Sequence, residues 1–454
     1  MVAGQQGCGP DPRRVHRLAG LARELDLLRA RAAAGTLKAK VSLEVLTRLV
    51  RLPRSTLHRY VTGQTLAPAE VLDRIVVALG ADPAEQREWS EAWYRVHGSE
   101  ARHVPEPAAV SSALPACIRG FTGRAAELAE LDRLLDTVTV DEAGSGLAIL
   151  AVSGPPGVGK TALAVRWAHQ VRGRFPDGCL YVDLRGYAPD HPLDAAESLA
   201  TLLGCLGADV PDDPAVRGAR YRSQLAGRRM LVLLDNALCA EQVRPLLPGT
   251  GSCVVLVTSR DDLAGLVARE GAHRMCLDVL SMPDALTLLR ILLNVDRLQA
   301  DPLAAVLLAE RCGRLPLALR VAAEATAAHP ETALAELAER PTTGLDWLAA
   351  GGDPRTDVRA VFSWSYRRLA AGDPDAASMF RLLGRHSCGD LAGVAALSGT
   401  ADHRARRLVD TLARAHLVKT SLGRYQMHGL LRAYATELAA EADGMGRGST
   451  PHPV

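Results

Sequence analysis

The sequence predicts a multidomain fold, in which an all-α bundle precedes an α/β domain with a parallel sheet and two further domains. Three observations lead to this fold class. The chain has 454 residues, which is too many for one ordinary hydrophobic core. Hydrophobic residues make up 48% of it but aromatic residues only 4%, which favours helices and buried parallel strands packed from Leu, Val and Ala. Between residues 117 and 280, strand-like apolar runs alternate with helical patterns.

Stretches rich in Gly, Pro and Ser mark the predicted domain boundaries. The predicted segments are a helical bundle at 15–97, a linker at 98–116, an α/β domain at 117–280, a helical domain at 281–350, a C-terminal domain at 355–440 and a disordered tail at 441–454. Four apolar runs in the α/β domain are the predicted strands: 147–153, 179–184, 230–234 and 253–258.

Composition and charge exclude several classes of protein. The net charge of +2 is too small to indicate a partner, so any nucleic-acid signal must be local. Nine cysteines without a C-x-x-C pair indicate reduced thiols and no cysteine metal site. No run approaches the roughly 18 apolar residues of a membrane span, and the N-terminus lacks the apolar core of a signal peptide. We therefore expect a cytoplasmic protein without a membrane partner.

A phosphate-binding motif follows the first predicted strand. Gly154-Pro155-Pro156-Gly157-Val158-Gly159-Lys160-Thr161 fits the pattern G-x-x-x-x-G-K-[ST] and leads into a predicted helix that starts near Ala162. The glycines let backbone N–H groups curl around a polyphosphate, and the helix N-terminus adds partial positive charge. Lys160 can reach the β- and γ-phosphates, and Thr161 can ligate Mg²⁺. The motif therefore predicts a bound nucleotide with Mg²⁺.

Two further strand ends support this site. The run 231–234 ends in Asp235, from which a carboxylate can hold Mg²⁺ beside a phosphate loop. The next residue, Asn236, cannot take a proton from attacking water as a carboxylate can, so we expect slow ATP hydrolysis at most. The last predicted strand leads into Thr258-Ser259-Arg260, where Arg260 is either a γ-phosphate ligand or an ordinary exposed arginine. With Lys160, these three residues form the predicted catalytic set.

This set resembles the NB-ARC module of the signal-transduction (STAND) ATPases, and the resemblance covers residues 117 to about 440. Phe121-Thr122-Gly123-Arg124 is similar to the family's opening motif, which borders the adenine. Gly313-Arg314-Leu315-Pro316-Leu317 is similar to the Gly-Leu-Pro-Leu motif, in which the proline packs against the base. The resemblance implies that ADP or ATP is held by Phe121, Gly123, Arg124, the phosphate loop, Ala162, Arg260, Pro316 and His428.

The same resemblance implies that the C-terminal domain is a winged helix, with 417–420 and 424–427 as its wing hairpin. His428 falls in the family's Met-His-Asp motif, where the histidine contacts the β-phosphate of ADP and locks the closed form. Gly429 replaces the aspartate, so a weaker lock and a partly open resting state are expected. Exchange for ATP would open the molecule and allow self-association. Because this chain ends soon after the winged helix, the sensor could be a separate protein.

Residues 42–61 resemble a Cro/C1-type (XRE) helix-turn-helix. Ser42 caps a predicted helix at 43–49, and Pro53 opens a second helix at 54–61. By this resemblance Arg54, Ser55, Thr56 and His58 face base edges in the major groove, and Arg59 contacts a backbone phosphate. Arg51 stands where the family usually has a turn glycine, which costs about 1 kcal/mol if the backbone there is left-handed.

The surroundings of this segment fit a DNA-binding bundle. Between residues 38 and 59, six basic residues (Lys38, Lys40, Arg48, Arg51, Arg54 and Arg59) face one acidic residue, Glu44, which would suit phosphate contacts. Helices expected at 68–79 and 83–96 complete the bundle, with Trp89, Trp93 and Tyr94 in its core.

The predicted function is a nucleotide-switched transcriptional regulator that binds a DNA duplex operator through residues 15–97. One alternative is a STAND ATPase of signalling or defence whose N-terminal bundle recruits a protein. A small-molecule kinase is disfavoured because no acceptor cleft is evident in the sequence. Duplex binding that weakens steeply with salt would separate the first two functions, since phosphate contacts release counterions.

Overall fold

A computed structural model describes residues 10–15, 17–36, 39–102, 114–140, 146–188, 191–293, 295–329, 332–339, 344–386 and 389–447. The chain divides into two units, Met1–Ala108 and Ala109–Val454. Each unit is described by itself.

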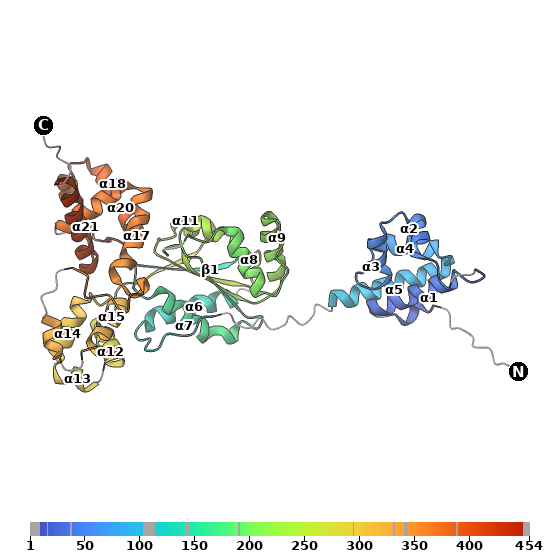
Figure 1. Cartoon of the computed structure of the whole chain (residues 1–454), viewed down its shortest axis with the longest axis horizontal. Helices are drawn as coiled ribbons and strands as arrows, with labels where there is room; N and C mark the ends of the chain where they lie inside the picture. Colours follow the sequence, from blue (N-terminus) through green and yellow to red (C-terminus); the bar gives the residue numbers. More distant parts are fainter. Residues whose placement is uncertain are drawn as a thin grey trace. The chain divides into compact units, whose positions relative to one another are not determined.

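The described residues of the N-terminal unit form helices joined by turns, without a strand (Figure 1). Its elements are η1 (Pro12–Arg14), α1 (Leu18–Arg31), α2 (Leu43–Val50), α3 (Arg54–Val61), α4 (Ala69–Ala78) and α5 (Pro83–Arg102). Ser42 caps α2, because its hydroxyl accepts a hydrogen bond from the amide of Val45. Leu46 of α2 and Leu57 of α3 are fully buried in one core with Trp89. The predicted pair of helices that share a core is therefore present.

Some details of this unit differ from the predictions. Tyr94 is 68% exposed, so its predicted place in the core is wrong. Trp93 does pack against the core, and its indole nitrogen donates to the carbonyl of Ala67 at 2.7 Å. The last helix, α5, continues to Arg102, into the segment predicted as a linker. Lys38 and residues 103–113 lie outside the described residues.

The larger unit begins with a five-stranded parallel sheet in the order β2-β3-β4-β1-β5. Its strands are β1 (Ala148–Ser153), β2 (Cys179–Asp183), β3 (Leu231–Ala237), β4 (Val254–Ser259) and β5 (His273–Cys276). The four predicted strands are present. The sequence did not reveal β5, because only Met275 of its four residues is buried and no apolar run marks it. Since β1 lies between β4 and β5, the loop that follows it leaves the sheet between two neighbouring strands.

Helices cover both faces of this sheet (Figure 1). On one face lie α6 (Ala125–Val140) and α7 (Lys160–Val171), and on the other α8 (Ala195–Cys205), α9 (Pro214–Leu225), α10 (Ala240–Val243) and α11 (Ala264–Glu270). Alternate residues of β1 serve the two cores: Leu150 and Val152 face α7, whereas Ile149 and Ala151 face the opposite core. Short turns η2 (Arg172–Arg174) and η3 (Arg244–Leu246) complete this part.

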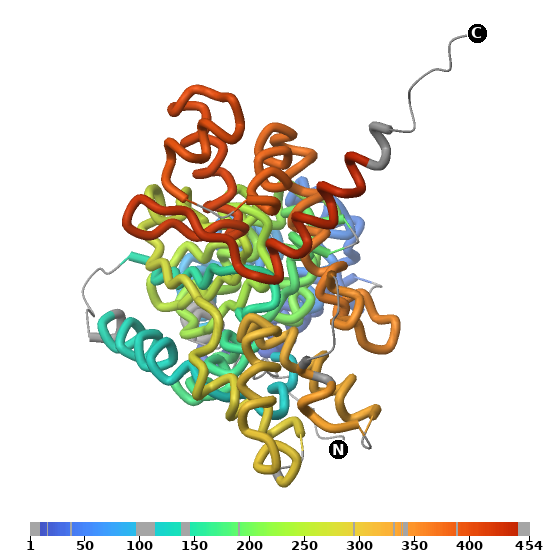
Figure 2. Tube along the Cα trace, turned by 90° about the vertical axis from the view of Figure 1, so that its left-hand side faces the viewer, coloured from blue at the N-terminus to red at the C-terminus, as the bar shows by residue number. Residues whose placement is uncertain are grey.

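Two helical blocks follow the sheet, and Figure 2 shows the yellow helices of the first and the red end of the second on opposite sides of the view. The helical block comprises α12 (Met282–Leu292), α13 (Val295–Ala300), α14 (Pro302–Arg311), α15 (Pro316–Ala327) and α16 (Leu334–Glu339). The C-terminal block comprises η4 (Pro354–Thr356), α17 (Val358–Gly372), α18 (Pro374–Arg385), α19 (Leu391–Ser398), α20 (Asp402–Arg414), the antiparallel hairpin β6 (Lys419–Ser421) and β7 (Arg424–Gln426), and α21 (Gly429–Arg447).

The end of the C-terminal block corrects one boundary. The segment from 441 was predicted to be a disordered tail, but α21 continues to Arg447, and residues 448–454 lie outside the described part. The interpretation of this block as a winged helix stays a prediction. Within the described ranges, no helix is both long and apolar enough to cross a membrane.

Candidate functional site

The phosphate loop connects β1 to α7 and depends on glycine at both ends. Gly154 has a φ of +149°, and a Cβ placed there would lie 2.7 Å from the carbonyl oxygen of Leu277. Gly159 has a φ of +94° directly before the first helical residue, Lys160. A side chain at either position would be strained, so this path of the loop favours glycine at 154 and at 159.

Lys160 is buried inside the loop that precedes it. Its ammonium group donates to the carbonyls of Gly154 at 2.8 Å and Pro155 at 2.9 Å. Burial, together with the nearby Arg260 guanidinium, lowers the pKa of Lys160 well below its usual value, although Asp235 opposes that shift. An arriving polyphosphate would stabilise the charged ammonium and replace these neutral carbonyl partners.

Thr161 and Asp235 form the second part of the site. The Thr161 hydroxyl donates to the Asp235 carboxylate at 2.9 Å, and the hydroxyls of Thr258 and Tyr181 donate to the same group. Burial raises the pKa of Asp235, while the hydrogen bonds from Thr258 and Thr161 oppose that rise. One hydroxyl and one carboxylate fit Mg²⁺, which takes few protein oxygens and completes its shell with water and phosphate. Among the described residues, no group of three or more His, Cys, Asp or Glu side chains is placed to hold a metal ion.

Asn236 follows Asp235 in a strained conformation beside a second carboxylate. Its φ is +55°, a region that asparagine tolerates better than most residues. Its backbone N–H donates to the hydroxyl of Thr258 at 2.9 Å, and its side-chain NH₂ group donates to the carboxylate of Asp183 at 3.3 Å. Asp183 pairs in register with Asp235 across β2 and β3. A carboxylate therefore does stand next to Asn236, supplied by the neighbouring strand.

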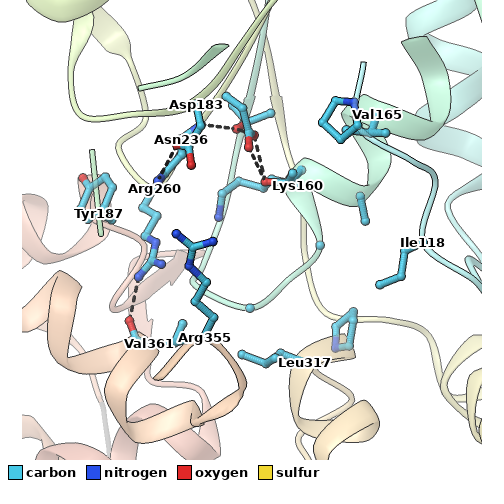
Figure 3. Close-up of a pocket in the computed structure, with 18 of the residues that line it drawn as sticks. Ile118, Lys160, Val165, Asp183, Tyr187, Asn236, Arg260, Leu317, Arg355 and Val361 are labelled. Carbon is cyan, nitrogen blue, oxygen red and sulfur yellow. Dashed lines mark hydrogen bonds between the residues drawn. The ribbon is translucent and has the colours of Figure 1, made fainter. Parts of the chain in front are cut away.

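A cavity of about 520 Å³ opens beside these residues (Figure 3). Its size is that of a small-molecule site. We call it the loop cavity. Of the residues predicted from sequence, it is lined by Gly157, Gly159, Lys160, Thr161, Ala162, Asp235, Asn236, Arg260 and Pro316.

Arg260 lies at the edge of this cavity, but its hydrogen bonds are to the C-terminal block. The guanidinium donates to the carbonyl of Val361 at 2.7 Å and to the hydroxyl of Ser365 at 2.9 Å, both on α17. It also lies over the rings of Tyr187 and Trp364, 5.1 and 5.7 Å from their centroids. Burial lowers its pKa to about 10, so the guanidinium stays charged at neutral pH. Arg260 is therefore not an ordinary exposed arginine, which was one of its two predicted alternatives.

Phe121 and Arg124 do not line the loop cavity but a smaller one. With Val158 and Pro316 they line a small cavity of about 40 Å³ that shares Gly159, Ala162 and Pro316 with the loop cavity. Arg124 is buried and donates to the carbonyls of Val158 at 3.2 Å and Asp278 at 2.6 Å. Its contacts in the structure brace the loop. Gly123, Gly154 and Pro156 line neither cavity.

His428 lies outside the loop cavity and is fully engaged by protein groups. Its Nδ1 accepts from the amide of Leu430 at 3.3 Å, so Nε2 carries the proton and donates to the carbonyl of Gly313 at 2.9 Å. Burial lowers the pKa of His428, which agrees with a neutral ring. The structure thus does not bring His428 together with Lys160, and a phosphate contact from His428 stays a prediction.

Sequence reasoning missed several residues of the loop cavity: Tyr181, Asp183, Tyr187, Arg320, Arg355 and Trp364. Asp183 closes a strand, as Asp235 does, so the same rule could have found it. Arg355 carries no such signal, because it lies on η4 beyond a glycine-rich boundary. In Figure 3 its side chain points from η4 toward Lys160.

The predicted DNA-binding residues of the N-terminal unit lie on one helix, α3. Arg54, Ser55, His58 and Arg59 are exposed, Thr56 is half-buried, and Leu57 faces the core. Arg59 donates to the hydroxyl of Thr65 at 3.0 Å. Arg51, between α2 and α3, has a φ of +54°, so the turn does require the left-handed conformation for which glycine is favoured. Of the basic residues between 38 and 59, Lys40, which precedes α2, forms an ion pair with Asp26.

Comparison with known proteins finds a domain family that matches part of each unit. Residues 20–89 match a helix-turn-helix domain family, and residues 129–298 match the NB-ARC domain family. The chain is 41% identical over 375 residues to the regulatory protein AfsR of Streptomyces griseus, a match that covers 80% of this chain and 37% of the relative. It is also 41% identical over 345 residues to AfsR of Streptomyces coelicolor, covering 73% of this chain and 34% of the relative. The disease resistance protein RPS4B of Arabidopsis thaliana is 26% identical over 342 residues, covering 70% of this chain and 27% of the relative. The chain thus spans about a third of the length of these regulators.

Proposed function

We propose that this chain, which joins a helix-turn-helix domain to an NB-ARC domain and is similar to bacterial regulators, is a nucleotide-switched transcriptional regulator. In this proposal ADP or ATP occupies the loop cavity, and the N-terminal unit binds a DNA duplex. We further propose that the larger unit consists of three domains, and that the last of them is a winged helix. Their proposed bounds are 117–280, 281–350 and 355–440.

The observation that carries the proposal is the bonding of Arg260. This arginine lines the same cavity as Lys160 and Asp235, yet it donates to Val361 and Ser365 of the C-terminal block. A γ-phosphate in the cavity would compete for the guanidinium, because a charge-assisted bond to phosphate is stronger than a bond to a neutral carbonyl or hydroxyl. ADP lacks that phosphate and would leave the bonds to α17 intact. The two nucleotides therefore differ in their effect on the C-terminal block, which is what a switch requires.

We propose that Mg²⁺ binds in the loop cavity together with the nucleotide. Thr161 and Asp235 would hold it beside the phosphates, where it neutralises charge. With Asn236 in place of a carboxylate, ATP hydrolysis would be slow. Each nucleotide state would therefore persist long enough to affect DNA binding.

The resting state would be the ADP form, in which the C-terminal block is docked. Because Gly429 replaces the carboxylate of the family's Met-His-Asp motif, a contact from His428 to a phosphate would lock this form only weakly. Activation would expose surface for self-association, and the signal would come from elsewhere in a longer polypeptide or from a separate sensor protein.

DNA binding would use the exposed face of α3. Arg54, Ser55, Thr56 and His58 would contact base edges, and Arg59 a phosphate. The alternative, a bundle that recruits protein, rests on the same exposed face and differs from DNA binding in its response to salt.

The test uses the full chain. Duplexes selected from a random-sequence pool would be titrated with protein loaded with Mg-ADP or with a non-hydrolysable Mg-ATP analogue. We expect the two nucleotides to change the affinity by about tenfold or more, which corresponds to a coupling free energy of roughly 1.4 kcal/mol.

Arg260→Gln is the informative variant, because it should bind both nucleotides and respond equally to them. Arg269→Gln, an exposed arginine on α11, is the matched control and should behave as the unmodified chain. Equal DNA affinity with both nucleotides in the unmodified chain would contradict the switch, and no salt-sensitive duplex binding at all would favour the protein-recruiting alternative.

A further inference from the structure

A second cavity of the larger unit is lined by Pro155 of the phosphate loop and by His428, and no ligand has been assigned to it above. Its volume is about 810 Å³. Residues from three parts of the larger unit line it: the ends of β1 and β5, the turn before α15, and the C-terminal block from α20 to the first turn of α21. We call it the rear cavity, because it reaches the phosphate loop at Pro155, whereas the loop cavity contacts Gly157 and Gly159.

Unpaired polar atoms gather in the rear cavity. Six buried side-chain nitrogen or oxygen atoms among the described residues have no hydrogen-bond partner, and three of the six belong to residues that line it. These three are the hydroxyl of Ser153, Nε2 of His416 and Nε of Arg314. Ser153 has no exposed surface and lies near the Cys276 thiol without a well-aligned hydrogen bond to it. Buried polar groups without partners are costly, so a ligand that pairs with them would be stabilised.

Two of these residues also have a strained backbone. Arg314 has a φ of +54° and His416 a φ of +53°, a left-handed region that is uncommon for residues other than glycine, although histidine adopts it more often than most. Such conformations cost of order 1–3 kcal/mol each and gather at ligand sites. Strain and unpaired polar groups therefore coincide in one cavity.

The charges around the rear cavity indicate an anionic ligand. Three of its basic residues are paired with carboxylates: Arg274 with Asp262 at 3.2 Å, Arg414 with Asp261 at 3.3 Å, and Lys419 with Asp278. Among the described residues no carboxylate forms an ion pair with Arg314, and the remaining acid, Asp410, is exposed. Burial lowers the pKa of His416 to about 4, so its ring is neutral and can donate from Nε2 while Nδ1 faces Cys276 at 3.9 Å. The unmatched groups are thus hydrogen-bond donors, one of them a guanidinium.

The rest of the lining is apolar and comes from Leu277, Val279, Leu417, Met427 and Leu431. A ligand that fits this surface has an apolar body in addition to its anionic group. The volume suits a molecule of roughly drug size.

The rear cavity is connected to the nucleotide site through the phosphate loop itself. Ser153 directly precedes Gly154, and Pro155 lines the rear cavity. The carbonyls of both Gly154 and Pro155 accept hydrogen bonds from Lys160. A ligand that holds Ser153 and packs on Pro155 would therefore stabilise the loop conformation in which Lys160 is turned back on the loop, away from phosphate.

We propose that the rear cavity is an effector site for a small amphiphilic anion, a molecule with one carboxylate or phosphate group on an apolar body. The anionic group is held by Arg314, Ser153 and His416. Its occupancy weakens nucleotide binding by stabilising the bonds from Lys160 to Gly154 and Pro155. The binding site stands on its own geometry, whereas the effect on nucleotide rests on the proposed function.

The test titrates the full chain with three probes that share an apolar body: sodium octanoate, octyl phosphate and 1-octanol. Isothermal titration calorimetry should show that one or both anions bind at least about tenfold more tightly than the alcohol, since only they pair with the guanidinium. The better of the two anions identifies the headgroup. Equal binding of anion and alcohol, or no binding of any probe up to its solubility limit, would overturn the proposal.

Variants locate the binding. Arg314→Gln and, as the smaller change, Ser153→Ala should each reduce anion affinity, the first by about tenfold or more. Arg274→Gln is the matched control, because its guanidinium lies on the same cavity but is paired with Asp262. If circular dichroism shows that Arg314→Gln is unfolded, the anion affinity of Ser153→Ala alone tests the site. Unchanged affinity in the folded variants would place the probe elsewhere and refute the site.

Coupling to nucleotide is measured separately. Release of a fluorescent ADP analogue should be several-fold faster with saturating octanoate or octyl phosphate than with 1-octanol. An unchanged rate would refute the effector role while leaving anion binding intact. Failure of the analogue to bind at all would instead refute the proposed function, so the two failures are distinguishable.

Discussion

The Asp235 cluster and the outer face of α3 are two polar surfaces built in opposite ways. Asp235 is 4% exposed and accepts hydrogen bonds from three hydroxyls that come from α7, β2 and β4. On α3, Arg54, Ser55 and His58 are exposed to solvent. The first arrangement is preorganised for a small ligand, and removal of one group there leaves the others unpaired. The second is solvated, so each residue contributes separately and modestly to binding. The predictions below test this difference, from the largest expected effect to the smallest.

The largest effect is expected at Lys160. Lys160→Ala should reduce the affinity for Mg-ADP by about a hundredfold or more, because it removes the ammonium group that would pair with the phosphates when nucleotide binds. Isothermal titration calorimetry measures the loss. Lys419→Ala removes a lysine of an exposed ion pair with Asp278 and should bind Mg-ADP normally. Normal binding by Lys160→Ala would remove the central claim about the loop cavity.

Asp235→Asn preserves the shape of the cluster but removes its charge. Nucleotide affinity should then become nearly insensitive to replacement of Mg²⁺ by EDTA, with an expected loss of about tenfold in the presence of Mg²⁺. Asp183→Asn is the matched control on the neighbouring strand and should retain the metal dependence. An undiminished response to Mg²⁺ in Asp235→Asn would show that the metal is held elsewhere.

Single changes on α3 should be smaller and additive. Arg54→Ala should cost about 1–3 kcal/mol of duplex affinity and relax the sequence preference, whereas Arg59→Ala should reduce the salt slope by about one. Arg87→Ala, an exposed arginine of α5, serves as the control. A collapse of all binding on one substitution would mean that α3 is a preorganised site like the Asp235 cluster, and would break the comparison.

Substitutions at the ends of β2 and β3 should change the rate of ATP hydrolysis in opposite directions. Asn236→Asp should raise the slow ATPase rate several-fold, and Asp183→Asn should lower it, because Asp183 is the carboxylate beside Asn236. Phosphate release under single-turnover conditions measures both. Should Asp183→Asn hydrolyse as fast as the unmodified chain, Asp183 would have no part in activating water.

The smallest effect concerns the turn between α2 and α3. Arg51→Gly should stabilise the N-terminal unit by about 1 kcal/mol, because glycine adopts the φ of +54° without strain. Arg48→Gly, inside α2, should destabilise it by a similar amount. Denaturant unfolding of the full chain followed by circular dichroism compares the two. Equal destabilisation by both changes would mean that the turn is not strained by Arg51.

Consecutive residues were enough to predict much of this protein. The phosphate loop, the cap at Ser42 and the strand that ends at Asp235 each depend on a few neighbours in sequence, since torsion preferences and capping act locally. The predicted helix-turn-helix and NB-ARC resemblances depend on such local motifs and are confirmed by the matching families. The short, mostly exposed β5 had no such local signal.

Only the tertiary structure decided which distant groups meet. The bonds of Arg260 to Val361 and Ser365 join residues about a hundred positions apart, and the bond of His428 to Gly313 spans a similar distance. The approach of Arg355 to the loop cavity and the unpaired donors of the rear cavity have the same origin. No local pattern encodes these contacts, because they depend on how the helical and C-terminal blocks pack against the sheet, and the same side chain could be solvated, bonded or bound to ligand with its neighbours in sequence unchanged.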